Sequence, residues 1–333
     1  MPASSRPRAF RVYAAGVPVY TNLDGTTPDK GLVDILKWQI GDRLSGRRRR
    51  DPGGFVTPRR AHDDALLRSQ HASLTWIGHA TFALRIGGKL LVTDPIWSDR
   101  LGLASARLCE PGVALHAMPK IDVVTVSHAH FDHLDLPTLR RIGPDALYVV
   151  PRDVGDIVRG AGLRNVVELG WWETHRVGDV AITLVPAQHW SMRAPWDRNR
   201  RLWGGFVFEA PEGIAYHAGD TAMSERVFGE IGARYPGIDW AMLPIGAYDP
   251  PWFMQPQHMG PEEALRAFEL LGARHLCAMH WGTFKLTDEP VGEPPERLRA
   301  ACAAASLSED RAWIFDVGET RALGSAARSQ AIT

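Results

Sequence analysis

The sequence predicts a four-layer sandwich, in which two β-sheets pack face to face and helices cover their outer sides. Of the 333 residues, 45% are hydrophobic and 23% are charged, as in a soluble globular protein with a sizeable core. Short β-rich runs separated by glycine begin near residue 73 and later alternate with helical patterns. The second half of this region resembles the first, which favours two packed sheets.

The individual elements follow from hydrophobic periodicity and turn residues. We expect strands at SLTWIG (73–78), TFALRI (81–86), KLLVTDP (89–95), IDVVTVSH (121–128), ALYVVP (146–151), NVVELG (165–170), DVAITLVPAQH (179–189), GGFVFEA (204–210), GIAYHAGD (213–220), WAMLPIG (240–246), HLCAMHWG (275–282) and RAWIFDV (311–317). Helices are expected at PTLRRIG (137–143), GPEEALRAFELLGA (260–273) and PPERLRAACAAASL (294–307). Pro261 and the acidic residues after it favour a helix start there.

The chain divides into an extension over residues 1–72 packed on the main domain, a main domain over residues 73–325, and a tail over residues 326–333. Within the extension, the helical pattern GLVDILKWQIGDRL places four apolar residues on one face, and core packing is expected for that face in preference to contact with lipid. The four are Leu32, Ile35, Leu36 and Ile40. The run from Arg47 to Arg50 is interpreted as a solvated loop.

Charge and cysteine content exclude several classes of protein. Thirty-eight basic residues balance thirty-eight acidic ones, so no global field attracts nucleic acid or an anionic membrane, and any such attraction must be local. Cys109, Cys277 and Cys302 are widely spaced, which indicates neither a disulfide framework nor a thiolate zinc cluster. The amino terminus lacks the apolar segment of a secretory signal, and no stretch has the length of a membrane span. We expect a cytoplasmic protein, with peripheral membrane contact left open.

The strongest chemical signal is SHAHFDHLD (127–135), which contains the motif H-x-H-x-D-H at the end of a predicted buried strand. His128 and His130 are two residues apart, so both rings can point the same way and bind one metal ion. The following turn directs Asp132 and His133 towards a second ion. Four such residues within six positions make a purely structural role for all of them a poor explanation.

Three further ligands each follow a predicted strand, namely His189, Asp220 and His280. By chemistry, one ion is expected on His128, His130 and His189, and the other on Asp132, His133 and His280. The Asp220 carboxylate then bridges both ions, with hydroxide as the remaining bridge. Imidazole and carboxylate without thiolate suit zinc, with iron and manganese as alternatives.

This ligand set resembles that of the metallo-β-lactamase superfamily, which implies an αββα fold. Between about residues 73 and 290 the chain resembles the N-acyl-phosphatidylethanolamine-hydrolysing phospholipase D family. The segments that carry this likeness are WIGHATF (76–82), TDP (93–95), HAHFDHLD (128–135), QHW (188–190), LWG (202–204), AGDT (218–221), PIGAY (244–248), WFM (252–254), QHMGPEEA (257–264) and HWGTF (280–284). The resemblance implies a two-zinc phosphodiesterase that releases an N-acylethanolamine from a phospholipid, and a homodimer.

Supporting residues are assigned from the same likeness. Asp132, Gln257 and His258 are expected at the catalytic centre, where His258 orients the phosphate or passes a proton to the leaving alkoxide. Asp94 and His79 are expected to hydrogen-bond the outer nitrogens of ligand imidazoles, with capping of a turn as the alternative for either residue. For substrate binding we expect Trp190, Tyr248 and Arg193. Arg193 begins a basic loop, and tryptophans in the motif segments line an acyl-chain cleft or pack in the core.

Two rival functions remain open on the sequence. One is a lactonase or phosphodiesterase for a small anionic metabolite, which a closed, arginine-lined pocket would favour, whereas an apolar groove would favour the lipid. The other is a non-hydrolytic metal or redox protein on the same fold. Redox relatives carry a glutamate within the first motif and an attached flavin domain, whereas this chain has His130 there.

Overall fold

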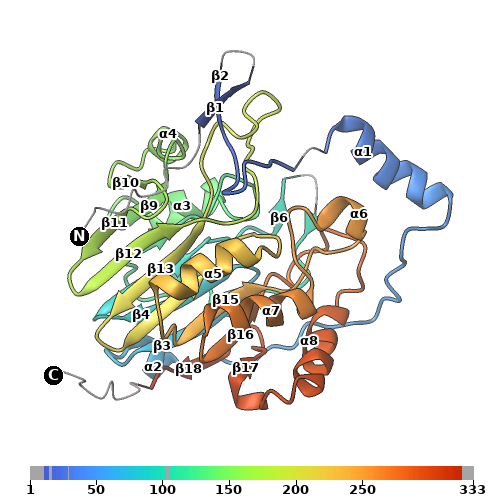
Figure 1. Cartoon of the computed structure of the whole chain (residues 1–333). Helices are drawn as coiled ribbons and strands as arrows, with labels where there is room; N and C mark the ends of the chain where they lie inside the picture. Colours follow the sequence, from blue (N-terminus) through green and yellow to red (C-terminus); the bar gives the residue numbers. More distant parts are fainter. Residues whose placement is uncertain (1–10, 15–16, 29, 103–104, 325–333) are drawn as a thin grey trace.

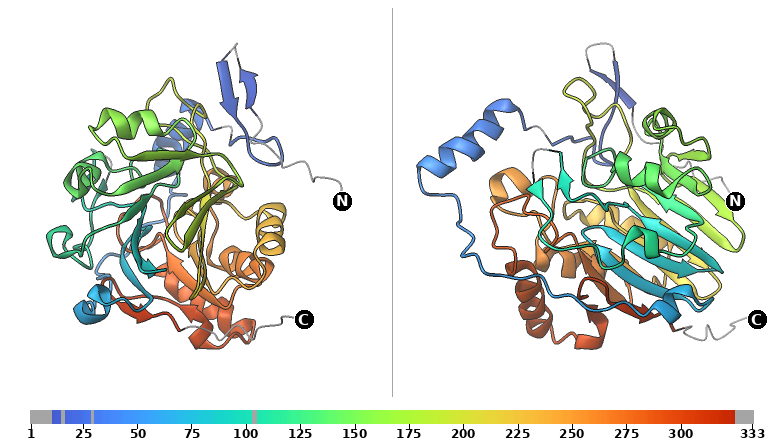
Figure 2. Two further views of the ribbon diagram at one scale, coloured as in Figure 1. Left: turned by 90° about the vertical axis from the view of Figure 1, so that its left-hand side faces the viewer. Right: turned by 180° about the vertical axis from the view of Figure 1, so that it is seen from behind.

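Two seven-stranded sheets face each other and helices cover both outer sides, which confirms the predicted four-layer sandwich (Figures 1 and 2). The structure is a computed structural model that describes residues 11–14, 17–28, 30–102 and 105–324. The expected tail over residues 326–333 lies outside the described residues.

Each sheet joins an antiparallel meander to a set of parallel strands. The first sheet has the order β10 (Val166–Leu169), β9 (Leu147–Pro151), β8 (Val123–Thr125), β5 (Lys89–Thr93), β4 (Thr81–Ile86), β3 (Ser73–Gly78) and β18 (Thr320–Ala322). The second has the order β11 (Thr174–Val177), β12 (Val180–Val185), β13 (Gly205–Ala210), β14 (Gly213–His217), β15 (Trp240–Pro244), β16 (His275–Met279) and β17 (Ala312–Trp313). Two short hairpins pair β1 (Arg11–Ala14) with β2 (Val17–Tyr20) and β6 (Arg100–Leu101) with β7 (Ser105–Ala106).

The helices divide between the two outer faces, with α3 and α4 outside the first sheet and α5, α7 and α8 outside the second (Figure 2). Their bounds are α1 (Leu32–Leu36), α2 (Asp64–Arg68), α3 (Leu136–Ile142), α4 (Gly155–Gly160), α5 (Glu225–Arg234), α6 (Pro251–Met254), α7 (Pro261–Leu271) and α8 (Glu293–Ala304). A π-helical segment (Lys37–Asp42) continues α1, and 3₁₀ turns lie at Leu115–Ala117 and Glu309–Arg311.

Side-chain alternation along the strands builds the core on both sides of the first sheet. In β4, Phe82 and Leu84 belong to the large cluster between the sheets, whereas Ala83 belongs to the cluster beneath α3 and α4. Val123 and Val124 in β8 divide in the same way. Burial on both faces explains why these strands read as continuous apolar runs.

The structure contains elements that the sequence did not predict, among them α5. Gly229 and Gly232 weaken its helical pattern. A β-carbon on Gly232 would lie 2.5 Å from the carbonyl oxygen of Leu270, so the glycine allows α5 to approach α7 closely. The expected strand over 311–317 is only Ala312–Trp313.

The expectation that the apolar face of α1 packs on the core is wrong. Ile35, Leu36 and Ile40 are 42%, 47% and 52% exposed, and α1 projects from the body of the molecule (Figure 1). The helix is held instead by Trp38 on its other side, which is buried and donates a hydrogen bond from Nε1 to Asp288 at 2.8 Å. Contacts made by Trp38 and Asp42 therefore decide which face meets the protein.

Candidate metal centre

The first predicted ligand group comes together where β8 and β12 end. The ring nitrogens of His128, His130 and His189 lie within 4.8 Å of one another. His128 Nε2 is 2.8 Å from His130 Nδ1, and His189 Nε2 is 3.3 Å from the same atom. Three imidazoles that converge from two different sheets can bind one metal ion.

The second predicted group lies beside the first. Asp132, His133 and His280 place a carboxylate oxygen and two ring nitrogens within 4.8 Å, and His79 joins them. The Asp132 Oδ2 atom is 3.5 Å from His133 Nε2, 3.6 Å from His280 Nε2 and 3.1 Å from His79 Nε2. His79, expected as a supporting residue, therefore contacts the carboxylate of this group directly.

Asp220 follows β14 and lies between the two groups. Its Oδ1 is 3.0 Å from His280 Nε2, and its Oδ2 is 3.2 Å from His133 Nε2. The same Oδ2 is 3.9 Å from His189 Nε2 and 4.0 Å from His128 Nε2. This is the position that the predicted bridging carboxylate requires, and bridging itself stays a prediction.

Unsatisfied buried atoms test whether these residues fit a metal centre. His133 Nε2, His280 Nε2 and Asp220 Oδ1 are buried, and despite the 3.0 Å between the last two, none of the three has a partner in hydrogen-bonding geometry within the described part of the chain. Buried polar atoms without partners are rare because each costs free energy. Their convergence on one point fits cation binding, and imidazole with carboxylate suits zinc, iron or manganese.

Hydrogen bonds behind the rings fix which nitrogen faces the centre. Asp94 Oδ2 is 2.7 Å from His133 Nδ1, and the Asp94 carboxylate also accepts bonds from the amide and hydroxyl of Ser127, each at 2.6 Å. The carbonyl of Gln257 is 2.7 Å from His189 Nδ1. Such contacts set the tautomer and orientation of a ligand imidazole, which is the role predicted for Asp94.

The electrostatics of the centre favour cations. Burial holds the pKa of His128 and of His189 well below the ordinary value for histidine. Burial also opposes charging of His280, but Asp220 and Asp132 outweigh it and raise the pKa of His280 to about 9. Two buried carboxylates thus create a negative potential at His280, and bound cations would replace the protons on the imidazoles.

Unusual backbone conformations mark the same region. His79, Asp94 and His280 adopt positive φ angles of 54°, 37° and 64°, which residues other than glycine rarely do. Such conformations cluster at functional sites because the surrounding structure holds them in place. The amide of His280 donates to the carbonyl of His79 at 3.1 Å, so these two strained residues hold each other.

A cavity of about 710 Å³ opens beside the ligands. Most of its wall is apolar. Its lining comprises Trp38, Leu101, Gly102, His130, Phe131, Asp132, Trp190, Asp220, Ala247, Met254, Gln257, His258, Leu286 and Thr287. The predicted residues Gln257, His258 and Trp190 therefore lie together on this wall. Burial lowers the pKa of His258 to about 4, so its ring is uncharged at neutral pH.

Two other predicted substrate-binding residues make different contacts. Arg193 Nη1 donates to the carbonyl of Leu134 at 2.7 Å, and its guanidinium lies 3.9 Å from the centre of the Phe131 ring. It therefore braces the loop that carries Asp132 and His133. The Tyr248 hydroxyl donates to Glu293 at 2.8 Å, and Tyr248 lines a neighbouring pocket that also includes His258 and Arg297 rather than the cavity beside the ligands.

Sequence reasoning missed two residues of the extension at this site. Asn22 is fully buried, and its Oδ1 accepts a hydrogen bond from the amide of His189 at 3.0 Å. Trp38 forms part of the cavity wall. Neither belongs to a ligand motif, and they lie 167 residues before His189 and 250 residues before Asp288 respectively, so no local signal points to either contact.

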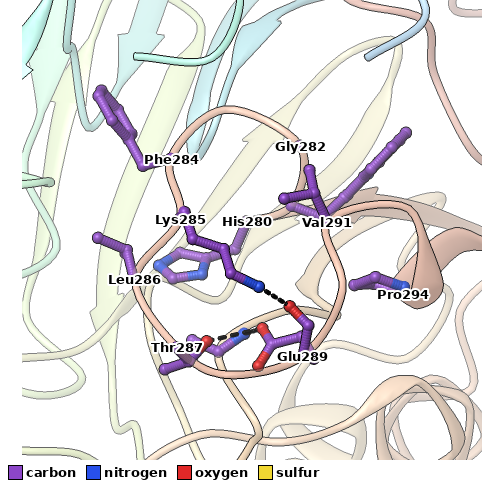
Figure 3. A pocket seen from close by; sticks show the side chains of 11 residues that line it. His280, Gly282, Phe284, Lys285, Leu286, Thr287, Glu289, Val291 and Pro294 are labelled. Carbon is purple, nitrogen blue, oxygen red and sulfur yellow. Dashed lines mark hydrogen bonds between the residues drawn. The ribbon is translucent and has the colours of Figure 1, made fainter. Parts of the chain in front are cut away.

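The loop after His280 is fixed by a buried glutamate (Figure 3). Glu289 Oε1 accepts bonds from the Thr287 hydroxyl and the Ala247 amide, both at 2.7 Å, and Lys285 Nζ donates to the Glu289 carbonyl. These bonds tie the loop that follows β16 to the loop that follows β15. The position of His280 is thereby set by two neighbouring strand ends.

Comparison with known proteins agrees with this geometry. A family model described as "Beta-lactamase superfamily domain" matches residues 90–281. The chain belongs to the metallo-β-lactamase superfamily. Within this superfamily it resembles "N-acyl-phosphatidylethanolamine-hydrolyzing phospholipase D 1" of Caenorhabditis elegans, with 34% identity over 263 residues that cover 74% of each chain. An uncharacterized protein of Mycobacterium tuberculosis is 38% identical over 296 residues, covering 85% of this chain and 77% of that protein.

A solved structure supports the fold independently. A metallo hydrolase from Ignicoccus hospitalis superposes with a TM-score of 0.58 at 24% identity, over 75% of this chain and 97% of that chain. The family model and the sequence relatives identify a metal-dependent hydrolase of the metallo-β-lactamase superfamily. Among the described helices, none has the length and apolar character needed to cross a bilayer.

Proposed function

We propose that this hydrolase is a dinuclear zinc phosphodiesterase of phospholipase D type that acts on lipids like N-acyl-phosphatidylethanolamine. The observation that carries the proposal is the apolar cavity of about 710 Å³ that ends on Asp132, Asp220 and His258. A cavity of this size and lining suits an acyl chain beside a phosphate. The name of the relative from Caenorhabditis elegans supports the same substrate class.

The basic loop after His189 argues against the rival small anionic substrate. Arg193 donates to loop carbonyls, Arg198 donates to the carbonyl of Lys30, and Arg201 pairs with Asp156 and Asp197. Their guanidinium groups are thus engaged within the protein, and none of the three lines the cavity among the described residues. These three arginines therefore do not form the closed, arginine-lined pocket that would favour a small anionic substrate.

The residues around the cavity have different roles in the proposed reaction. Bound at the two ligand groups, zinc ions would supply Lewis-acid polarisation of the phosphate and a nucleophilic water at neutral pH. The carboxylates of Asp220 and Asp132 would supply the negative charge that holds these ions. His258 and Gln257 lie on the cavity wall, where they orient the phosphate. Phe131, Trp190 and the other apolar lining residues exclude water and receive the acyl chain.

The deciding experiment measures metal content by mass spectrometry together with turnover, before and after chelation. Two metals per chain and chelator-sensitive release of N-acylethanolamine are expected. Two metals with turnover of only a soluble phosphodiester such as bis(p-nitrophenyl) phosphate would overturn the lipid substrate. No bound metal after purification and reconstitution with zinc, iron or manganese would overturn the centre itself.

A matched pair of variants strengthens that test. His130→Ala removes a proposed ligand and should abolish turnover. His275→Ala, the control, removes a histidine at the start of β16, at the opposite end of that strand from His280, where its Nδ1 contacts the carbonyl of Asp239. Full activity of His130→Ala would contradict the mechanism. A cytoplasmic location is part of the proposal, because Cys109, Cys277 and Cys302 are all free thiols. The homodimer implied by the resemblance stays a prediction that light scattering tests.

A further inference from the structure

We propose that the N-terminal arm, defined as residues 31–50, is a docking surface for an anionic phospholipid bilayer. The arm comprises α1, the π-helical segment and the arginine-rich turn that follows, and it projects from the body beside α6 and β6 (Figure 1). The inference deepens the proposed function, because it states how the enzyme meets a lipid substrate.

The outward side of the arm is apolar. Val33, Leu36, Ile40 and Leu44 are 78%, 47%, 52% and 83% exposed. They follow one another at intervals of three or four residues, which places them along one side of a helix. Single exposed apolar residues are ordinary on a protein surface, but four along one short helix form a contiguous patch that marks an interaction site. An amphipathic helix of this kind lies in the interface of a membrane.

The end of the same helix is basic. A pocket of about 650 Å³ is lined by Arg43, Gly46, Arg48, Arg49 and Arg50. Arg48 pairs with Asp288 and Arg49 with Glu293, but Arg43 and Arg50 have no ion-pair partner in the described part of the chain. Arginine binds phosphate with a planar fork of donors. Two unpaired guanidinium groups beside exposed leucine and isoleucine side chains therefore match the headgroups and acyl boundary of an anionic bilayer.

Charge selects this occupant over a second copy of the chain. The arm carries two acidic residues: Asp34 accepts a hydrogen bond from the Gly31 amide, and Asp42 is buried beneath Trp252. The exposed part of the arm is thus positively charged. The whole chain has a formal net charge of zero, so a second copy carries no excess of negative charge that would attract the arm. Two copies of this arm would repel each other across a twofold axis.

The arm also borders the cavity. Trp38 lies on the side of the arm opposite its exposed residues, is buried, and forms part of the cavity wall together with Leu101 and Phe131. Phe131 is itself 54% exposed at this wall. Insertion of the arm into a bilayer would therefore bring the cavity next to the acyl region, so a lipid could enter without crossing water.

The experiment is sedimentation with vesicles that contain no N-acylated lipid, so that binding is measured without turnover. Vesicles of phosphatidylcholine alone are compared with vesicles that also contain phosphatidylglycerol. The full-length protein should bind the anionic vesicles, and added salt should weaken binding. The variant L36S/I40S/L44S should lose about tenfold or more of this partitioning. R43Q/R50Q should lose about fivefold for each arginine.

Val56→Ser is the matched control, because Val56 is 81% exposed, like Leu44, but lies outside the arm. All variants should retain turnover of a soluble phosphodiester, which shows that the metal centre is intact and separates failure of docking from failure of the proposed function. Equal vesicle binding by wild type and both arm variants would overturn the proposal. So would a triple variant that binds vesicles normally but changes from dimer to monomer in light scattering, which would make a second copy the occupant.

Discussion

The metal centre and the N-terminal extension border the same cavity, but the chain builds them by different means. Every proposed ligand from His128 to His280 follows a strand, either β8 of the first sheet or β12, β14 or β16 of the second, so strand ends of both sheets supply the site. The extension instead reaches the cavity through isolated side chains such as Asn22 and Trp38. Strand ends thus provide the candidate ligands, whereas the extension provides side chains that contact a ligand or line the cavity.

The largest expected effect is at the carboxylate shared by both ligand groups. Asp220→Asn should release both metals and lower turnover by about a thousandfold or more, because the amide removes the charge that the two groups share. Metal content and turnover are measured on the same sample. Two retained metals with full turnover would show that Asp220 is not the bridge.

A smaller loss is expected behind the ligands. Asp94→Asn should lower the affinity of one metal ion by about 10- to 100-fold, because the carboxylate that orients His133 is lost. Zinc titration of the apoprotein measures this change. Asp122→Asn is the control, since Asp122 accepts a bond from the Leu90 amide in the same sheet but contacts no proposed ligand.

The extension is tested first through the cavity wall. Trp38→Ala should raise KM for a long-chain phospholipid by about tenfold, because it removes a large apolar surface from the wall. Turnover of a soluble phosphodiester should stay near wild type. Trp38→Phe keeps a ring but loses the bond to Asp288, so it should retain most lipid activity. Equal losses on both substrates would instead indicate damage to the centre.

Asn22 tests whether the extension also positions a ligand. Asn22→Ala leaves the His189 amide and the Trp203 indole without this acceptor, which should cost about 1–3 kcal/mol of stability. Zinc affinity should fall by about fivefold as His189 loses its support. Thermal unfolding and zinc titration measure the two effects. Asn165→Ala removes a hydrogen bond to Ala146 far from the site and should change zinc affinity little.

The smallest expected effect is a loosening of the extension at low pH. Arg49 holds the pKa of Glu293 below its ordinary value of 4.5 by a hydrogen bond that outweighs burial. Because the pKa of Glu293 is lower in the folded protein, the Arg49–Glu293 pair stabilises the fold fully at a pH above the pKa of the unfolded state. This stabilisation is lost as the pH falls through the pKa of the folded state. Tryptophan fluorescence and limited proteolysis should therefore show the extension loosening below about pH 4.5, before the sandwich unfolds. Glu293→Gln should loosen it already at neutral pH.

Much of the sandwich could be predicted because its signals are local. The strands β3 and β4 have the predicted bounds, since apolar runs closed by glycine define them without reference to the rest of the chain. The positions of His128, His130, Asp132 and His133 relative to one another follow from motif spacing at one strand end. Helix α5 was not predicted, because two glycines weaken its helical pattern and the role of one of them, Gly232, is visible only in its contact with α7.

The sequence by itself therefore determined the sandwich, the superfamily and the residues that gather at the metal centre. Only the tertiary structure decided what lies behind and around them: Asp94 behind His133, Asn22 behind His189, and the outward side of the arm. The physical reason is separation along the chain. Periodicity reports which residues of one element share a side, but which side meets the protein depends on distant partners, such as Asp288 for Trp38 and Trp252 for Asp42.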